Sequence, residues 1–367
     1  MRVSRQPFFH AGVLTSLVST MLFTGCNNKS AAKATSEPEP ASVTLRYRWQ
    51  PCGNHVYRIF SKNNAVDRVE SVSNRTKVRV VVDLALNVVE AATDGNALID
   101  TRVLHYGISN VGRRKGLEGM ELSVPLRGAG SFPVQVGGVT ETCVIDDRVQ
   151  VIKDGISVGD NKSRNPIARG VGEALQESLP RLFGSRAEIV HSPLGRCVIR
   201  KRAGDYFAAD LADGPVLSPV SLLGLRFPRQ PVRPGDTWQA TYRVTRLGQH
   251  EILDGGLQGT VTFCLKPEAV PEKPGWVRVA VSDSLQFKNG KRRMKFHLLK
   301  KTYDRELIDL QRTCAGEILF DPAAGMVMAA KLQTKTTARF NHLLPDGQRL
   351  PHVDRSDCIT EVSLLGK

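Results

Sequence analysis

The chain has 367 residues, of which 41% are hydrophobic and 24% are charged, and an excess of lysine and arginine gives it a formal net charge of +15. This composition excludes a collagen, a mucin-like stalk and a wholly disordered chain. No apolar run of about 18 or more uncharged residues occurs after the first thirty residues, which excludes a polytopic membrane protein. The remainder is long enough for one large domain or two modest ones.

The N-terminus has the pattern of a secretory signal. Arg2 and Arg5 provide the positive start, and Ala11–Thr24 is a largely apolar stretch without charge. A helix of this length spans roughly 21 Å, which is less than the ~30 Å hydrocarbon core of a bilayer. Residues 1–25 are therefore predicted to be a signal peptide rather than a permanent membrane span.

The end of this stretch, Leu22-Phe23-Thr24-Gly25-Cys26, resembles the lipobox of bacterial lipoproteins, with Phe23 where leucine is usual. The resemblance implies that Cys26 becomes the first residue of the mature protein and carries acyl chains such as palmitate, which hold it to a membrane. Asn27 stands where an aspartate would signal retention at the inner membrane, and this favours the outer membrane. Residues 26–42 lack apolar periodicity and are predicted to be a flexible tether.

Loss of residues 1–25 removes two arginines and no acid, which leaves a net charge of +13. The expected partners of a basic envelope protein are anionic lipid, lipopolysaccharide phosphate or acidic wall polymer. Export and the lack of a recognisable motif argue against nucleic acid. Six cysteines remain besides Cys26, and they permit either up to three disulfides or buried free thiols.

Alternation with a period of two dominates the rest of the chain and predicts strands. The first strand is expected at 43–49, where Val43, Leu45, Tyr47 and Trp49 share a face, and others are expected at 237–244 and 261–265. Turn sequences predict three hairpins. The hairpins join 76–91 to 99–103 through residues 94–96, 277–287 to 293–298 through Asn289-Gly290, and 318–320 to 326–340 through residues 321–325.

Strands of this length twist and curl. The predicted fold is therefore mainly β, with long antiparallel curled sheets or a half-barrel and one amphipathic helix packed against it. Pro166–Phe183 carries apolar residues at helical spacing and supplies that helix. The expected organisation is an N-terminal β-rich part at 43–165, the helix at 166–184, and a C-terminal β-rich part at 185–367.

No motif in the sequence predicts a catalytic residue, a cofactor or a metal site. Gly155-Ile156-Ser157-Val158-Gly159 matches G-x-S-x-G, but a loop follows where a nucleophile elbow needs a helix. His342, His352, Asp354 and Asp357 are close in sequence and could in principle bind a metal. The favoured interpretation of these four residues is a polar C-terminal loop.

Two phrases carry a second resemblance. Residues 231–238 read P-V-x-x-G-D-T-W, and residues 316–325 read G-x-I-x-F-D-x-x-x-G before a long strand. Together they resemble an uncharacterised family of secreted, β-rich bacterial lipoproteins. The resemblance covers about residues 43–340 and implies no known active site.

The sequence therefore predicts a non-enzymatic envelope lipoprotein that binds an apolar or amphiphilic ligand inside its sheet. The alternative is a basic surface module that binds anionic lipid or acidic polymer, and a hydrolase with an unrecognised site is the least favoured. The candidate cavity-lining residues are Val80, Val82, Leu84, Met294, Phe296, Met328 and Leu332. The candidate anion contacts are Arg293, Lys295 and Lys301.

Overall fold

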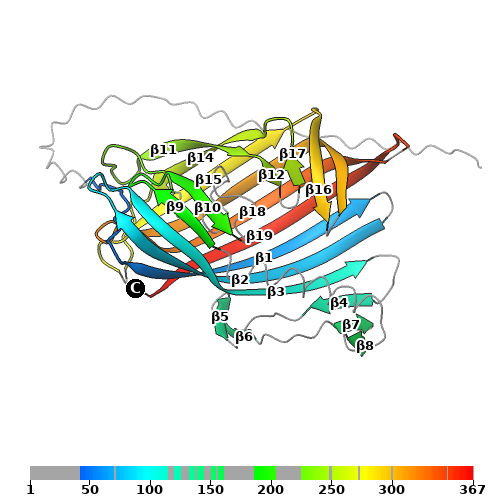
Figure 1. Ribbon diagram of the computed structural model, residues 1–367, viewed down its shortest axis with the longest axis horizontal. Coiled ribbons are helices and arrows are strands. Elements are labelled where there is room, and N and C mark those ends of the chain that lie inside the picture. The colour runs from blue at the N-terminus through cyan, green and yellow to red at the C-terminus, as the bar shows by residue number, and fades with distance from the viewer. Residues whose placement is uncertain are drawn as a thin grey trace, which may run out of the picture. The chain divides into compact units, whose positions relative to one another are not determined.

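The structure is a computed structural model (Figure 1). It describes residues 42–69, 72–114, 120–124, 132–136, 139–143, 150–153, 156–160, 186–203, 225–247, 250–271, 273–298, 301–344 and 346–366. All of them belong to one compact unit, Pro40–Lys367. Cys26, the signal, nearly all of the tether and the predicted helix at 166–184 lie outside the described residues.

All long regular elements among the described residues are β-strands. The strands are β1 (Asn54–Val69), β2 (Val72–Ala91), β3 (Ala97–Arg114), β4 (Met120–Val124), β5 (Phe132–Val136), β6 (Val139–Cys143), β7 (Gln150–Lys153), β8 (Ile156–Asp160), β9 (Arg186–His191), β10 (Cys197–Ala203), β11 (Thr237–Val244), β12 (Arg246–Leu247), β13 (His250–Ile252), β14 (Leu257–Leu265), β15 (Val277–Phe287), β16 (Arg292–Leu298), β17 (Lys301–Asp321), β18 (Met326–Leu343) and β19 (Arg349–Gly366). No helix in this part of the chain is long and apolar enough to cross a membrane.

Seventeen of the strands form one antiparallel sheet, and β5 and β6 form a separate pair (Figure 1). The main strand order is β10-β9-β3-β2-β1-β19-β18-β17-β15-β14-β11. The strands β4, β7 and β8 extend the sheet from β3, and β16, β13 and β12 extend it from β17. No backbone pairing joins β10 to β11 among the described residues, so the sheet is not closed into a barrel. The prediction of one long antiparallel β-architecture is confirmed, and strands from both predicted parts of the chain enter the same sheet.

Two extended segments, residues 42–49 and 225–232, close one side of the main hydrophobic core, and we call them the closing segments. Val43 and Val232 exchange backbone hydrogen bonds of 2.7 and 2.9 Å. The amide of Tyr47 donates to the carbonyl of Pro193 in the β9–β10 turn at 2.9 Å, and that of Arg48 donates to Gly325 in the β17–β18 turn at 3.2 Å. The prediction of a sheet strand at 43–49 is therefore wrong, because this segment forms one isolated bridge with Val232 and otherwise bonds to turns instead of along a neighbouring strand.

The alternating side chains of this first segment are nevertheless buried, as their pattern indicates. Leu45 is 1% and Tyr47 3% exposed, and the Tyr47 ring packs against Phe227 and Phe320 with centroids 5.1 and 5.9 Å apart. They join one cluster that contains core residues of β1, β2, β3 and β9 together with those of β14, β15, β17 and β18. Strands far apart in the sheet order thus share one core around the closing segments.

The prediction of a hairpin at Asn289-Gly290 is also wrong. The strands that flank it, β15 and β16, do not pair with each other but lie end to end along β17. Asn289 adopts a φ of 50°, its amide donates to Asp309 Oδ1 at 2.8 Å, and the Gly290 amide donates to the Ile308 carbonyl at 3.2 Å. The turn therefore spans the irregularity in β17 between Leu307 and Asp309 instead of reversing the chain onto its neighbour. The other two predicted hairpins are confirmed as β2–β3 and β17–β18.

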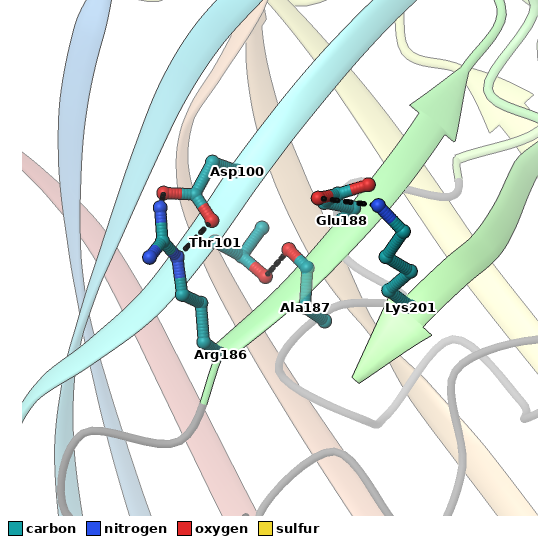
Figure 2. Close-up of polar contacts among 6 residues, drawn as sticks. All are labelled: Asp100, Thr101, Arg186, Ala187, Glu188 and Lys201. Atoms are coloured by element: carbon teal, nitrogen blue, oxygen red, sulfur yellow. Dashed lines mark hydrogen bonds and ion pairs between the residues drawn. The ribbon is translucent and has the colours of Figure 1, made fainter. Parts of the chain in front are cut away.

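Polar contacts fix β9 to β3 and β10 to β9 (Figure 2). The Arg186 guanidinium donates to both oxygens of Asp100, at 2.6 and 2.8 Å. The hydroxyl of Thr101, which is fully buried, donates to a backbone carbonyl of β9 at 2.8 Å, and Lys201 on β10 lies 3.5 Å from Glu188 on β9. These contacts hold in place the β9–β10 turn that receives the closing segments.

Five cysteines lie among the described residues whose side chains are placed, and all five are free thiols. Cys52 is exposed, Cys197 and Cys314 are buried, and Cys264 and Cys358 are half-buried. Burial raises the pKa of Cys197 to about 12 and that of Cys314 to about 11. These two thiols are therefore uncharged core side chains at neutral pH.

Candidate functional site

A strongly basic surface lies on four adjacent strands, β2, β1, β19 and β18, on the face opposite the core. The strand registers align four outward positions from each strand into four rows. The rows are Ser73, Arg68, Val353, Arg339; Arg75, Val66, Arg355, Thr337; Lys77, Asn64, Asp357, Lys335; and Arg79, Lys62, Ile359, Gln333. Eight of these sixteen positions are lysine or arginine and one is acidic. We call this surface the basic face.

Strand geometry determines how closely these charges lie. Neighbouring strands are about 4.8 Å apart, and residues two apart on a strand are about 6.8 Å apart, so the basic face measures roughly 14 by 20 Å. Seven of the eight cations are exposed, and Lys62 is half-buried. Lys62 and Arg79 stand directly opposite each other in the register. Like charges in such positions destabilise a sheet unless an anion compensates them.

Few acidic groups offset this charge from within the grid. Asp357 is its single acid, and the Gln333 side-chain amide donates to it at 2.9 Å. Arg339, at one corner, forms an ion pair with Asp309 on β17. Val66 is 36% exposed between Arg75 and Arg355 and adds an apolar contact surface among the cations.

The anion contacts predicted from sequence lie elsewhere, on β16 and at the start of β17. Arg293 lies 3.2 Å from Asp254 in an ion pair. Lys295 is exposed, but the register places Glu251 and Asp304 beside it on the two flanking strands. Lys301 begins β17 opposite Leu298. This surface is therefore one of mixed charge, in contrast to the basic face.

Most of the predicted cavity-lining residues lie in packed core. Val82, Leu84 and Leu332 are each 1% exposed in the cluster that surrounds the closing segments, and Val80 and Met328 pack against its edge. Met294, also 1% exposed, lies in a second apolar cluster formed by residues of β11 and of β13 to β18. Phe296 is in β16, and its side chain is outside the described set.

A buried polar group lies where the two clusters meet. Arg312 donates to Asp283 at 2.8 Å, and the Tyr242 hydroxyl donates to the same carboxylate. Arg312 is 6% and Asp283 4% exposed, and Tyr242 packs against both apolar clusters. The apolar interior is therefore interrupted by a charged pair rather than continuous.

A second polar group involves four strands and lies near the C-terminal end of β1 and the N-terminal end of β19. His352 on β19 is 5% exposed, and its Nε2 contacts Asp67 of β1 and lies 2.6 Å from Asp354 of β19. Its Nδ1 lies 2.7 Å from His342 Nε2 on β18, and Arg305 Nε of β17 donates to His342 Nδ1 at 3.2 Å. The expectation of a loop here is wrong for these residues, because the strands extend through them and the turn is confined to residues near 344–348.

The two histidines of this group have opposite electrostatic surroundings. Burial opposes the protonation of His352, but hydrogen bonds to Asp354 and Asp67 and their charges outweigh it and raise its pKa to about 9. Burial lowers the pKa of His342 to about 4, assisted by the charges of Arg305 and His352. At physiological pH His342 is therefore neutral and His352 is protonated.

The sequence alone did not identify the basic face. Lys77 and Arg79 stand out on the polar side of one predicted strand, but the cations of β1, β19 and β18 become their neighbours only through pairings across almost the whole chain. Asp67 was missed for the same reason, because it is 285 residues from His352. The G-x-S-x-G serine, Ser157, lies in β8, which pairs with β7, and is followed by further strand rather than by a helix.

Comparison with known proteins gives no relative by sequence: no family model and no curated protein matches the chain. Among solved structures, it is similar to one described as "lipid-protein interactions in lipovitellin", with 10% identity over 86% of this chain and 25% of that chain, at a TM-score of 0.37. It is also similar to OpdL of Pseudomonas aeruginosa (8% identity, 85% and 99% covered, TM-score 0.17) and OccK9 of the same organism (9%, 86% and 100%, 0.17). The chain spans only a quarter of the lipovitellin chain, and TM-scores this low do not establish a shared fold.

Proposed function

We propose that this chain is a lipid-anchored envelope protein whose basic face binds the anionic headgroups of the membrane that holds its anchor. The observation that carries the proposal is the concentration of eight cations and one acid on sixteen aligned, outward positions of β2, β1, β19 and β18. A layer of phosphates carries the charge that complements such a concentration of cations.

The magnitude of this attraction is sufficient to orient a tethered domain. Each lysine or arginine near an anionic membrane surface contributes about 1 kcal/mol, and the interaction decays over a Debye length of about 8 Å at physiological salt. Contact must therefore be close, which the exposure of seven of the eight cations permits. Adjacent rows and strands then match several headgroups at once rather than one.

The lipobox-like sequence supplies the second element of the proposal, an acylated Cys26 in the outer membrane. A tether of residues 26–42 reaches at most about 60 Å when fully extended, so a domain held there stays within reach of the bilayer. Lipid chains and a basic patch are the two signals that together give stable membrane attachment. The resemblance to secreted β-rich lipoproteins supports the same interpretation.

The test measures vesicle binding by the full chain with Cys26→Ser, which removes the acyl anchor and isolates the basic face. One variant neutralises Arg75, Lys77 and Arg355 to glutamine. The matched control neutralises Arg293, Lys295 and Lys301 to glutamine and so removes the same charge from β16 and β17. Vesicles of phosphatidylcholine with and without phosphatidylglycerol are compared by co-sedimentation.

We expect binding only to vesicles that contain phosphatidylglycerol. Loss of three contacts at about 1 kcal/mol each should weaken it about 100-fold in the first variant and only slightly in the control. Equal weakening in both variants would show that net charge rather than the basic face is responsible. Binding to acidic polymer but not to vesicles would favour a wall-binding module instead.

The second candidate function is the binding of an amphiphile inside the sheet, which is the function that the sequence alone favours. It ranks lower because the described candidate liners lie in packed apolar clusters and because Arg312 and Asp283 lie between these two clusters. A lipid recovered by organic extraction of the purified protein would support this candidate.

A further inference from the structure

The polar group at His352 has the ligand arrangement of a metal site. Asp67, His352 and Asp354 each offer one ligand atom, and these atoms all lie within 4.8 Å of one another. Two carboxylates from different strands converge on Nε2 of a histidine that is 5% exposed. One N–H cannot donate well to two carboxylates, whereas a metal ion can be shared by all three groups.

His342 provides the outer support that such sites need. Metal-binding histidines almost always use their second ring nitrogen for a hydrogen bond that orients the ring, and His352 Nδ1 lies 2.7 Å from His342 Nε2. Phe340 packs against the His352 ring with centroids 5.9 Å apart and limits its rotation. The β1–β19 and β18–β19 registers position Asp67 and Phe340 on either side of β19 at this level of the sheet.

The proton positions show what metal binding would change. Asp67 and Asp354 favour a proton on His352 Nε2, and Arg305 Nε donates to Nδ1 of the neutral His342 ring. A metal on His352 Nε2 displaces the proton from that nitrogen, and this proton leaves to solvent. His352 then keeps its proton on Nδ1 and donates it to His342 Nε2, which requires the His342 proton to be on Nδ1, so Arg305 must release His342.

We propose that Asp67, His352 and Asp354 bind Zn²⁺, with His342 as the supporting partner and Arg305 as the residue that opposes occupation. An imidazole together with two carboxylates suits Zn²⁺ better than Mg²⁺ or Ca²⁺, which prefer oxygen ligands alone. Around Zn²⁺, ligands at 2.0–2.2 Å lie about 3.3 Å from one another, so the 2.6 Å separation of His352 Nε2 and Asp354 Oδ1 must lengthen by less than about 1 Å. Three protein ligands leave one position open for water or a ligand group.

The experiment titrates Zn²⁺ into the full mature chain in detergent against a chromophoric chelator. We expect one equivalent to bind to the wild type, about tenfold weaker or no binding to Asp67→Asn and Asp354→Asn, and unchanged binding to Asp357→Asn. Asp357 is the matched control because it lies on the same strand, three residues from Asp354, but on the opposite face. Arg305→Met should bind more tightly, since it removes both the opposing charge and the competing hydrogen bond.

The gain in Arg305→Met cannot arise from misfolding, so it keeps the test informative even if an aspartate variant folds poorly. Co²⁺ substitution identifies the ligands, because nitrogen and oxygen ligation lacks the thiolate charge-transfer bands that binding at the exposed Cys52 would give. Failure of the wild type to bind, equal affinity in the aspartate variants, thiolate bands, or no gain in Arg305→Met would each overturn the proposal. None of these outcomes depends on vesicle binding by the basic face.

Discussion

Arg312 shows how this sheet accommodates charge in its interior. Its guanidinium lies 2.8 Å from Asp283, and Tyr242 completes the group by donating its hydroxyl to that carboxylate. Burial of Tyr242 raises its pKa well above the usual value, so the hydroxyl keeps its proton at physiological pH. A buried charge that loses its partner keeps the full desolvation penalty, which is why breaking such a pair costs more than the pair itself contributes.

The first prediction at this scale concerns Asp283→Asn. It should lower the free energy of unfolding by about 3 to 5 kcal/mol, because Arg312 would remain charged in the core without a counter-charge. Urea denaturation followed by tryptophan fluorescence measures it. Asp254→Asn breaks the exposed ion pair with Arg293 and serves as the comparison, with a much smaller change expected. Equal urea midpoints for the two variants would mean that loss of the Asp283 charge costs no more than loss of an exposed ion pair.

At the scale of the elements, the closing segments pack against turns that leave little space for an added side chain. Gly195, in the β9–β10 turn, has a φ of +81°, and a Cβ there would lie 1.8 Å from the carbonyl oxygen of Leu225. Gly235 has a similar φ of +92°, but a Cβ would meet nothing within 4 Å. Both positions tolerate a side chain poorly because of their backbone conformation, and only the first also presses against a closing segment.

The second prediction follows from this pair of glycines. Gly235→Ala should cost about 1 to 2 kcal/mol from left-handed strain alone. Gly195→Ala should cost at least about 2 kcal/mol more, because the Leu225 backbone must move out of the core. Urea unfolding of both variants under the same conditions measures the difference. Similar losses would indicate that residues 225–232 are not held tightly by the β9–β10 turn.

The elements also mark the limit of prediction from sequence. Alternation correctly identified β2, β11, β15 and β18, because a strand with one buried face shows that face in its own residues. It could not distinguish the segment at 43–49 from a strand, since an extended segment through a core buries alternate residues equally well. The hairpin prediction at Asn289-Gly290 failed because the residues of a turn do not show that β17 is long enough to pair with two strands in succession.

At the scale of the whole molecule, the basic face and the proposed metal site arise from the same four-strand region but use opposite faces of it. The registers that align the cations on one face bring Asp67, His352 and Asp354 together on the other. Neither arrangement can be derived in full from neighbouring positions in the sequence, because β1 and β19 come from the two ends of the described chain. This is why the sequence indicated the β-class, the basic charge and the proximity of His342, His352 and Asp354, but neither Asp67 nor the basic face.

The third prediction concerns attachment by the whole protein. With the proposed acyl anchor present, the protein should remain with membranes at high salt, because lipid insertion is not electrostatic. Cys26→Ser should leave only the basic face and be released as salt rises. Fractionation of cells expressing each form, washed at low and high salt, measures this. Release of the wild type by salt would contradict the anchor, and retention of Cys26→Ser at high salt would contradict a purely electrostatic second contact.

The pairing of β1 with β19 has a consequence for biogenesis. During synthesis the N-terminal end of the chain emerges first, so β1 must wait until residues 349–366 have been made before its second neighbour, β19, is available. Until then the open borders of β1 and β18 can recruit other strands, and contacts of such long sequence separation form slowly. Completion of the sheet should therefore be a late folding step, and deletion of β19 should destabilise the fold more than deletion of an edge strand, because it removes a neighbour from both β1 and β18.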